Sequence, residues 1–313
     1  MGGSCELTDL NVIFLGTGGS IPTPKRGLSA IAIRRKTELL LFDCGEGTQR
    51  QMIQAGVGFH RKTKIFVTHM HGDHVLGLPG LLQTMSLLDR TKKLEIYGPQ
   101  GIKAFVEAIN QTVRFSLTFP VQVSEIDAGL VCEEKEYTVY ATQSDHMNPS
   151  LAYALIEKPR PGRFNIEKAK ELGVPEGPLW SKLQDGSSVK LPSRRIVKPE
   201  MVLGHPRPGR KIVYTGDTRP SENLVKLAEN ADLLIHEATF DDELMERAME
   251  DGHSTPSMAA ETAKEAGAKW LVLTHISARY KDAGLLLEQA RKVFSNTDVA
   301  QDFLRLELPL SEA

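Results

Sequence analysis

Four side chains that can bind a metal ion lie within six residues of the chain. The segment 69–74 reads His-Met-His-Gly-Asp-His, so its candidate ligands are His69, His71, Asp73 and His74. His69 and His71 share a side because of their spacing, and Asp73 with His74 can serve a second point close by. Imidazole and carboxylate groups suit zinc or a similar borderline metal. A polar loop with incidental histidines is the alternative, and nine histidines in 313 residues make it a poor one.

Two metal ions need more ligands than this segment holds. Three further polar residues at or near predicted strand ends are His146, Asp217 and His275. A carboxylate has two oxygens, so Asp217 is suited to bridge two ions, and each histidine can complete the ligand set of one. Each residue taken alone is more often an ordinary polar group. Together with the segment 69–74 they predict a two-metal site.

The elements that must position these residues alternate between strand and helix patterns. We expect strands at 11–15, 30–34, 39–42, 64–68, 96–97, 138–142, 211–215, 233–236, 270–274 and 304–308, and helices at 47–55, 77–88, from about 101, and at 222–228, 255–266 and 283–293. This alternation indicates a layered α/β protein. One strand runs into His69 and another, of similar sequence, runs into His275. We therefore expect the strand ends of two halves to meet at one site.

The composition excludes several classes of protein. A net charge of −2 excludes a globally basic nucleic-acid coat protein, although a local basic patch remains open. Three scattered cysteines without a Cys-x-x-Cys pair exclude a disulfide framework and a zinc finger, and they indicate a reducing compartment. No apolar run has the ~18 residues of a transmembrane helix, and residues 1–9 lack the pattern of a signal peptide. We expect a cytoplasmic protein with no membrane partner.

A long basic segment interrupts the pattern. Residues 158–198 contain ten basic and four acidic residues, a net charge of +6, with nine glycines or prolines and no clear strand. A solvated loop is the common explanation of such a segment. The size of the local charge excess favours an arm that binds a polyanion.

The metal-ligand pattern resembles that of the metallo-β-lactamase superfamily, and further motifs resemble the ribonuclease Z family within it, which processes the 3′ ends of tRNA. These motifs are LFDCGEGTQ at 41–49, GDTR at 216–219, HEATF at 236–240, HST at 253–255, LTHISARY at 273–280, and the segments 157–162 and 173–178. The ligand pattern alone is shared by many hydrolases. The HEAT and HST motifs and the basic segment are far more specific, and the similarity runs from about residue 10 to 309.

The resemblance implies a fold, an assembly and a ligand set. The fold is a four-layer αβ/βα sandwich, a single α/β domain over residues 1–313, with an inserted flexible arm at about 157–200 that grips the tRNA elbow. The implied assembly is a homodimer with two Zn²⁺ per subunit. The implied ligands are His69, His71 and His146 for one ion, Asp73, His74 and His275 for the other, and Asp217 as the bridge.

The chemistry implied is zinc-dependent hydrolysis of a phosphodiester in a tRNA precursor. Attack by a metal-activated water leaves a 3′-hydroxyl on the tRNA and a 5′-phosphate on the trailer. Asp73 is expected to orient the water, His253 to protonate the leaving oxygen, and Glu237 to orient His253. Without the resemblance, His253 is interpreted as an exposed loop histidine beside a helix cap, and Glu237 as a buried ion-pair partner.

Other polar residues near these motifs have weaker signals. Asp43 follows a predicted strand and is expected to hydrogen-bond a ligand histidine. Arg279, Lys25 and Arg26 are candidates for phosphate contacts or plain surface charge, and PTPKRG at 22–27 stands where bacterial members often carry PxKxRN. Gly16 to Gly19 read as a tight turn rather than a phosphate cradle.

Two other functions compete with tRNA processing. One is a small-molecule hydrolase of the same superfamily, such as a lactonase, an arylsulfatase or a phosphodiesterase. The other is a non-catalytic RNA-binding scaffold. A long basic arm has no use in the first, and a complete ligand set with His253 and Glu237 argues against the second.

Overall fold

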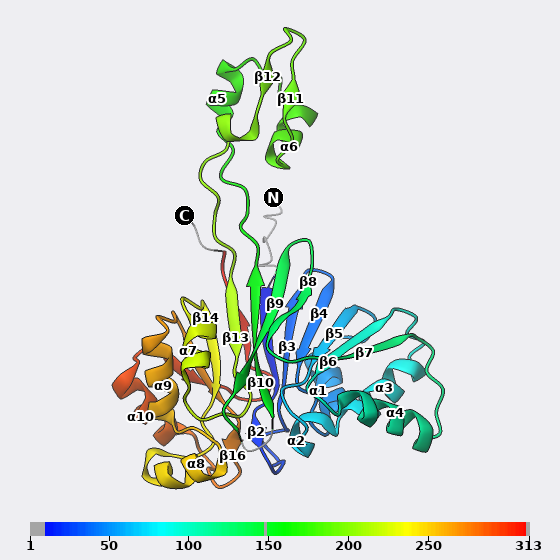
Figure 1. Ribbon diagram of the computed structural model, residues 1–313, viewed down its shortest axis with the longest axis vertical. Coiled ribbons are helices and arrows are strands. Elements are labelled where there is room, and N and C mark those ends of the chain that lie inside the picture. Colours follow the sequence, from blue (N-terminus) through cyan, green and yellow to red (C-terminus); the bar gives the residue numbers. More distant parts are fainter. Residues whose placement is uncertain (1–9, 147–148, 311–313) are drawn as a thin grey trace, which may run out of the picture. The chain divides into compact units, whose positions relative to one another are not determined.

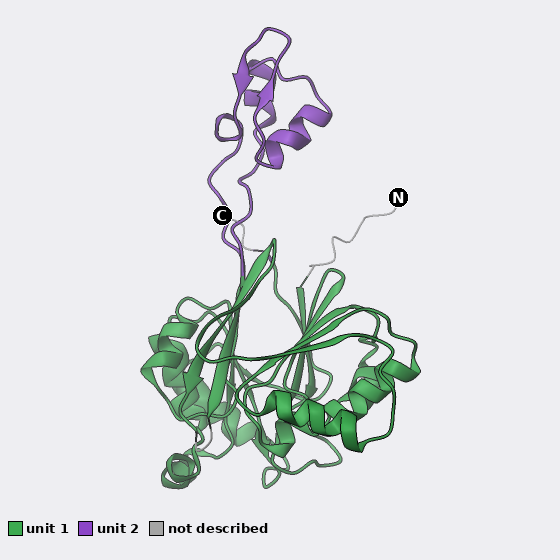
Figure 2. Ribbon diagram, turned by 45° about the vertical axis from the view of Figure 1, so that its right-hand side comes forward, with its two compact units in different colours: residues 1–156, 211–309 green, residues 157–210, 310–313 purple. Residues whose placement is uncertain are grey.

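The computed structural model describes residues 10–146 and 149–310, which form two compact units. Of the described residues, unit 1 comprises 10–146, 149–156 and 211–309, and unit 2 comprises 157–210 with Leu310 (Figure 2). Cys5, one of the three cysteines, and the segment considered for a signal peptide lie outside the described residues.

Unit 1 is built on two seven-stranded sheets. In spatial order, the first sheet contains β18 (Arg305–Glu307), β1 (Leu10–Gly16), β3 (Ala30–Arg35), β4 (Glu38–Phe42), β5 (Lys62–Phe66), β6 (Leu94–Gly98) and β7 (Val121–Glu125). The second contains β17 (Thr297–Val299), β15 (Leu271–Thr274), β14 (Leu233–Glu237), β13 (Lys211–Tyr214), β10 (Ser150–Glu157), β9 (Tyr137–Ser144) and β8 (Gly129–Glu133).

Helices cover the outer face of each sheet, which gives four layers (Figure 1). The first sheet packs against α1 (Thr48–Ala55), α3 (Leu78–Leu87) and α4 (Ile102–Thr112), and the second against α7 (Glu222–Ala228), α9 (Pro256–Glu265) and α10 (Gly284–Val293). The remaining helices of unit 1 are α2 (Gly72–Val75), η2 (Asp242–Leu244) and α8 (Met245–Asp251). The αβ/βα sandwich expected from the sequence is confirmed.

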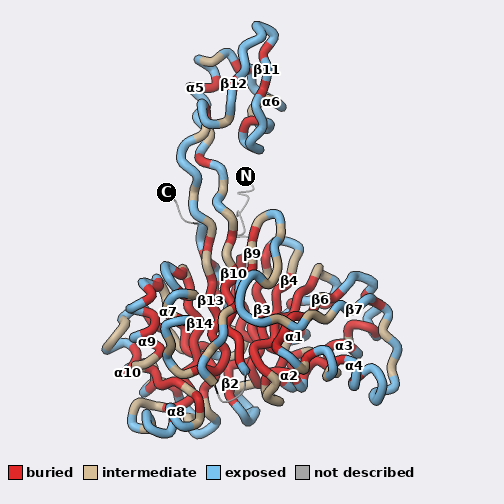
Figure 3. Tube along the Cα trace, in the orientation of Figure 1, coloured by how far each residue is buried: buried red, intermediate tan, exposed pale blue. Residues whose placement is uncertain are grey.

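The alternation of side chains along the strands explains why both faces of each sheet are buried. In β1, Val12 and Phe14 face the second sheet, whereas Ile13 and Leu15 face the helices. Both sets are apolar, so the strand is an almost unbroken hydrophobic run, as expected for a sheet covered on both sides. Figure 3 shows buried residues concentrated in the two sheets.

Parallel strands bring the candidate ligands to one edge of the sandwich. In the first sheet β4 and β5 run parallel, and in the second β13, β14 and β15 run parallel. The carboxyl ends of parallel strands lie at the same edge of a sheet, and ligands bind there in open α/β sheets. The loops after these strands carry Asp43, His69, Asp217 and His275, and Glu237 is the last residue of β14.

Several elements differ from those expected from the sequence. β7, β8 and β10 were not predicted: β7 and β8 are short, partly polar edge strands, and β10 contains two alanines, which have low strand propensity. The helix predicted at 77–88 is α3, and the short helix α2, which begins inside the segment 69–74 and ends at Val75, precedes it.

Unit 2 folds around an apolar cluster of its own. It contains α5 (Ile166–Glu171), α6 (Pro178–Gln184), β11 (Val189–Lys190), β12 (Ile196–Val197) and η1 (Pro199–Met201). The expectation of no strand here is wrong, because β11 and β12 pair in antiparallel fashion. Two residues per strand are too few to produce a periodic pattern. The side chains of Ala169, Val174, Leu183, Val189, Leu191, Val197 and Val202 form the cluster. None of the described helices, in either unit, has the length and apolar character needed to cross a bilayer.

Candidate metal centre

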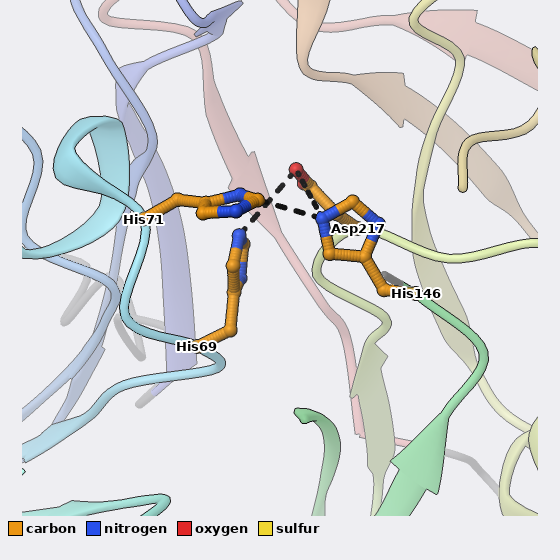
Figure 4. Close-up of side chains that lie close together, drawn as sticks. All are labelled: His69, His71, His146 and Asp217. Atoms are coloured by element: carbon orange, nitrogen blue, oxygen red, sulfur yellow. Dashed lines mark hydrogen bonds and ion pairs between the residues drawn. The ribbon is translucent and has the colours of Figure 1, made fainter. Parts of the chain in front are cut away.

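The structure brings all seven candidate ligands together at the edge of unit 1. The segment 69–74 follows β5, His146 follows β9, Asp217 follows β13 and His275 follows β15. One group consists of His69, His71, His146 and Asp217 (Figure 4), and another consists of Asp73, His74 and His275. Within each group the potential ligand atoms lie within 4.8 Å of one another.

Asp217 lies between the two groups. Its Oδ2 atom is 3.7 Å from Nε2 of His69, and its Oδ1 atom is 3.4 Å from Nε2 of His74 and 3.3 Å from Nε2 of His275. Two ligand atoms of a tetrahedral zinc ion lie about 3.3 Å apart, given bond lengths of ~2.0–2.1 Å. The separations therefore suit a carboxylate that contributes one oxygen to each of two ions.

Two buried polar atoms of this cluster lack the hydrogen bond that burial normally demands. They are Nε2 of His69 and Oδ1 of Asp217, and both residues are almost completely buried. A buried polar atom without a partner costs about 1–3 kcal/mol. A metal ion would supply the missing partner to both atoms, so the residues present fit the group that the fold family implies.

The electrostatics of the histidines are consistent with cation binding. Burial and the neighbouring imidazole of His74 hold the pKa of His69 well below its usual value, so His69 stays neutral and keeps a lone pair. Burial also lowers the pKa of His71. His74 differs: although burial opposes its charged form, the carboxylates of Asp217 and Asp43 raise its pKa. The cluster thus favours positive charge beside Asp217.

Asp43 fixes the orientation of His74. Nδ1 of His74 donates to Oδ2 of Asp43 at 2.8 Å, which leaves Nε2 facing the site. The carboxylate also accepts from the backbone N–H of Thr68 at 2.7 Å and from the hydroxyl of Tyr214 at 2.8 Å. The expected hydrogen bond between Asp43 and a ligand histidine is therefore present, and such contacts hold a ligand ring in position.

Two other candidate ligands are held through their Nδ1 atoms. Nδ1 of His146 donates to the carbonyl of Gly252 at 2.7 Å, and Nδ1 of His275 lies 2.8 Å from the hydroxyl of Thr239. The same hydroxyl donates to Oε2 of Glu237 at 2.6 Å. Both rings therefore present Nε2 to the cluster.

His253 and Glu237 form a close pair beside the ligands. Nδ1 of His253 lies 2.9 Å from Oε1 of the buried Glu237 and 3.9 Å from Oδ2 of Asp217. Burial opposes the charged imidazole, yet the carboxylate of Glu237 raises the pKa of His253 to about 9. Although burial opposes ionisation of Glu237, the charge of His253 lowers the pKa of that carboxyl. A protonated His253 is thus available at the edge of the cluster.

Sequence reasoning missed three residues that shape this site. The hydroxyl of Thr239 links His275 to Glu237, and the backbone N–H of Ser20 donates to Oδ2 of Asp73 at 2.7 Å. A Cβ atom on Gly19 would come within 2.5 Å of the imidazole of His275. Gly19 belongs to residues 16–19, which were expected to form a turn, and Thr239 belongs to the HEATF motif, but neither residue was given a role at the site. In place of that turn, β2 (Gly18–Gly19) pairs with β16 (Ile276–Ser277), which is far away in the sequence.

Three residues of the site, Asp43, Ser20 and His275, themselves adopt an unusual backbone conformation. Their φ angles are 57°, 60° and 56°, in the left-handed region that favours glycine. Each holds a group of the site: a carboxylate on His74, an N–H on Asp73, and a candidate ligand imidazole.

The arginines considered as phosphate contacts differ in their surroundings. Arg279 is exposed, and its guanidinium lies over the ring of Phe240 at 4.7 Å from the centroid. Arg26 is partly buried and donates to Thr17 and to the carbonyl of Ala300, so it faces the protein rather than solvent. Lys25 is exposed.

Comparisons with known proteins identify the fold and the family of the chain. Residues 10–157 match the family described as anti-Pycsar protein Apyc1, and residues 199–276 match the beta-lactamase superfamily domain. The solved structure of the short form of human tRNase Z is 34% identical, with a TM-score of 0.72, and the match covers 96% of this chain and 100% of that one. The metallo-β-lactamase fold protein YhfI from Bacillus subtilis, 20% identical with a TM-score of 0.67 over 95% and 98% of the two chains, shares the fold.

Curated relatives match over almost the whole chain. Ribonuclease Z of Methanosarcina mazei is 52% identical over 301 residues, which are 96% of this chain and 98% of that protein. Ribonuclease Z of Myxococcus xanthus is 49% identical over 306 residues, which are 97% and 99% of the two chains. Identity at this level over this length, together with the fold, shows that the chain belongs to the ribonuclease Z family.

Proposed function

We propose that the protein is an endoribonuclease that removes the 3′ trailer from tRNA precursors and uses two zinc ions per subunit. The observation that carries this proposal is the convergence of the seven candidate ligands at one sheet edge of a chain that is 52% identical to a ribonuclease Z. In this proposal His69, His71 and His146 hold one ion, Asp73, His74 and His275 hold the other, and Asp217 bridges them.

The mechanism divides the work between the metal ions and the protein. Bound metal ions would lower the pKa of a water molecule and neutralise charge on the phosphoryl oxygens. Asp73, held by the N–H of Ser20, accepts a hydrogen bond from the attacking water and orients it. His253 donates a proton to the leaving 3′-oxygen, and Glu237 keeps His253 protonated and oriented. The products are a tRNA with a 3′-hydroxyl and a trailer with a 5′-phosphate.

Cleavage of a 3′-extended tRNA precursor by purified protein tests the whole proposal. We expect a cut next to the discriminator base, with a 3′-hydroxyl on the tRNA, that disappears with a chelator and returns with zinc. Metal analysis of the protein as purified tests the identity and number of the ions. Folded, metal-loaded protein that leaves the precursor intact would instead favour a small-molecule hydrolase, and lactones and sulfate esters would then be screened.

Unit 2 is the proposed tRNA-binding arm, because residues 158–198 carry a net charge of +6. The ends of the unit pair with each other: the N–H of Glu157 donates to the carbonyl of Arg210 at 2.9 Å. A short Gly-Ser turn can therefore replace residues 158–209. We expect this variant to lose at least about 100-fold in kcat/KM on the precursor, since 2.7 kcal/mol or more of RNA contacts disappear. Hydrolysis of bis(p-nitrophenyl) phosphate should persist.

The control for this variant keeps the arm and changes only its acidic residues. Glu167→Gln with Glu171→Gln makes unit 2 more basic, and precursor cleavage should not fall. Equal loss of precursor and diester hydrolysis in the arm replacement would contradict the assignment, because it would indicate damage to the metal centre.

The proposal includes a homodimer, which exposed apolar side chains support. Ile53 is 63% exposed on α1, Leu76 is 53% exposed at the end of α2, and Leu87 is 76% exposed on α3. Light scattering after gel filtration should give a molar mass twice that of the chain. Leu87→Asp should reduce the mass to that of one chain, whereas Leu130→Asp on β8 should leave the dimer intact. A monomer at micromolar concentration would contradict this part.

The proposal also places the protein in the cytoplasm, where its substrate is found. Cys44 and Cys132 are free thiols, as expected in a reducing compartment. Fractionation of cells with an antibody to the protein checks this location.

A further inference from the structure

Four polar side chains form a cluster behind the metal centre, at the base of the loop between β1 and β3. They are Thr17, Arg26, Gln51 and Asp302, which we call the Arg26–Asp302 cluster. Nη1 of Arg26 donates to the hydroxyl of Thr17 at 2.6 Å and to the carbonyl of Ala300 at 2.7 Å. The Thr17 hydroxyl donates to Oδ1 of Asp302 at 2.7 Å. Thr17 thus connects the two charged groups.

Asp302 ties both ends of this loop to the body of unit 1. Its Oδ2 atom accepts from the backbone N–H of Gly27 at 2.7 Å and from Nε2 of Gln51 at 2.8 Å. Gln51 also donates to the carbonyl of Leu15 at 2.7 Å. Within the loop, the N–H of Gly18 donates to the carbonyl of Gly27 at 2.9 Å. The start and the end of the loop are therefore fixed by one carboxylate.

Residues 17–20, at the start of the same loop, touch one half of the metal centre. Ser20 donates its N–H to Asp73, and Gly19 lies so close to His275 that a Cβ atom would collide with the ring. The carbonyl of Thr17 accepts from the N–H of Ile276, directly after His275. Among the contacts described, the loop holds Asp73 and His275. Nδ1 of His146, in contrast, donates to the carbonyl of Gly252, outside the loop.

We propose that Arg26 and Asp302 are positioning residues for the metal-binding half-site formed by Asp73, His74 and His275. They act through the loop, by keeping the Ser20 N–H on Asp73 and the backbone of Gly19 against His275. This inference rests on the proposed function, because it requires that the half-site binds a metal ion. It gives Arg26 a role inside the protein in place of a contact with RNA phosphates.

Metal binding rather than activity provides the test. Apo protein is titrated with Zn²⁺ against a chromophoric chelator, and we expect two binding steps in the unmodified protein. We expect Asp302→Ala and Arg26→Ala to weaken one step about 10- to 100-fold, the usual range for residues that hold metal ligands. The other step should be unchanged. Arg26→Lys should recover part of the loss, because the ammonium can still donate to Thr17 or Ala300.

Matched variants identify the affected ion and guard against misfolding. Thr17→Val removes the hydroxyl at nearly constant volume and should reproduce the loss, whereas Thr17→Ser should not. Exposed Lys25→Ala, next to Arg26, should leave both steps unchanged. In a His71→Ala background, which weakens the other half-site, Asp302→Ala should weaken the remaining tight step.

The outcomes distinguish failure of this inference from failure of the proposed function. Both binding steps unchanged in Asp302→Ala and Thr17→Val, or both weakened equally, would overturn the positioning role. If the unmodified protein binds no zinc in the same titration, the proposal of a metal centre is itself wrong. Thermal unfolding of the apo variants shows whether a loss of zinc affinity comes from misfolding. If Asp302→Ala or Arg26→Ala misfolds, the comparison of Thr17→Val with Thr17→Ser tests the positioning role instead.

Discussion

Replacing Asp217 with asparagine should lower kcat for precursor cleavage about 1000-fold, because some 4 kcal/mol of transition-state stabilisation is lost. The amide has nearly the shape of the carboxylate, but it carries no charge and presents N–H groups on one side. That side would face either Nε2 of His69 or the Nε2 atoms of His74 and His275. The amide therefore cannot serve both groups of ligands, and the affinity for metal should fall together with kcat.

Elemental analysis and a zinc titration of Asp217→Asn measure the metal loss, and single-turnover cleavage measures the rate. The control is Asp145→Asn, an exposed carboxylate paired with Arg219 and adjacent in sequence to His146. This control should cleave within about twofold of the unmodified protein, since exposed ion pairs contribute little. Full zinc content and an unchanged rate in Asp217→Asn would refute the bridging role.

The second large effect concerns proton transfer. His253→Ala should lower kcat on the precursor about 10²- to 10³-fold, because the leaving 3′-oxygen then departs without a proton. Zinc content and affinity for tRNA should stay constant, because Nδ1 of His253 pairs with Oε1 of Glu237 at 2.9 Å rather than with Oδ2 of Asp217, which is 3.9 Å away. The measurements are single-turnover kinetics, elemental analysis and a tRNA binding titration.

A change of leaving group separates this role from a structural one. A p-nitrophenyl phosphodiester releases a stable anion that needs no proton, so the defect of His253→Ala should shrink to a few-fold on that substrate. His60→Ala, at an exposed position, should be unaffected on both substrates. Loss of zinc from His253→Ala, or an equal defect on the two substrates, would show that the histidine holds the site together instead.

For a physical reason, the sequence identified side chains that the structure brings close together, and their binding of a metal stays a prediction. Four of them share one short segment directly after a strand, and the others follow strands whose ends meet at the same edge. Residue type and strand position are both local properties, so a linear sequence records them. The layered fold was predictable on the same basis, because apolar runs of strand and helix length alternate along unit 1.

The contacts that orient these residues were not predictable, because they depend on pairing between distant segments. Thr239 lies in the HEATF motif, but the role of its hydroxyl becomes visible only when His275 is placed beside it. Ser20 acts through its backbone N–H, which any residue could supply. The sequence did not predict β10, although this strand lies inside its sheet, because alanines have low strand propensity. Tertiary packing, rather than local preference, decides these cases.

The left-handed backbone at Ser20, Asp43 and His275 bears on how this protein could be stabilised. An L-residue in this conformation costs about 1 kcal/mol relative to glycine. Glycine would relieve this cost, but at Asp43 it would leave the N–H of Thr68 and the hydroxyl of Tyr214 without their acceptor, at about 1–3 kcal/mol each. At His275 it would remove a buried candidate ligand. Ser20 is therefore the position at which a search for more stable variants would select glycine, and that change would loosen the N–H that holds Asp73. Thermostability and turnover pull in opposite directions at this turn, and engineering for heat resistance should begin away from it.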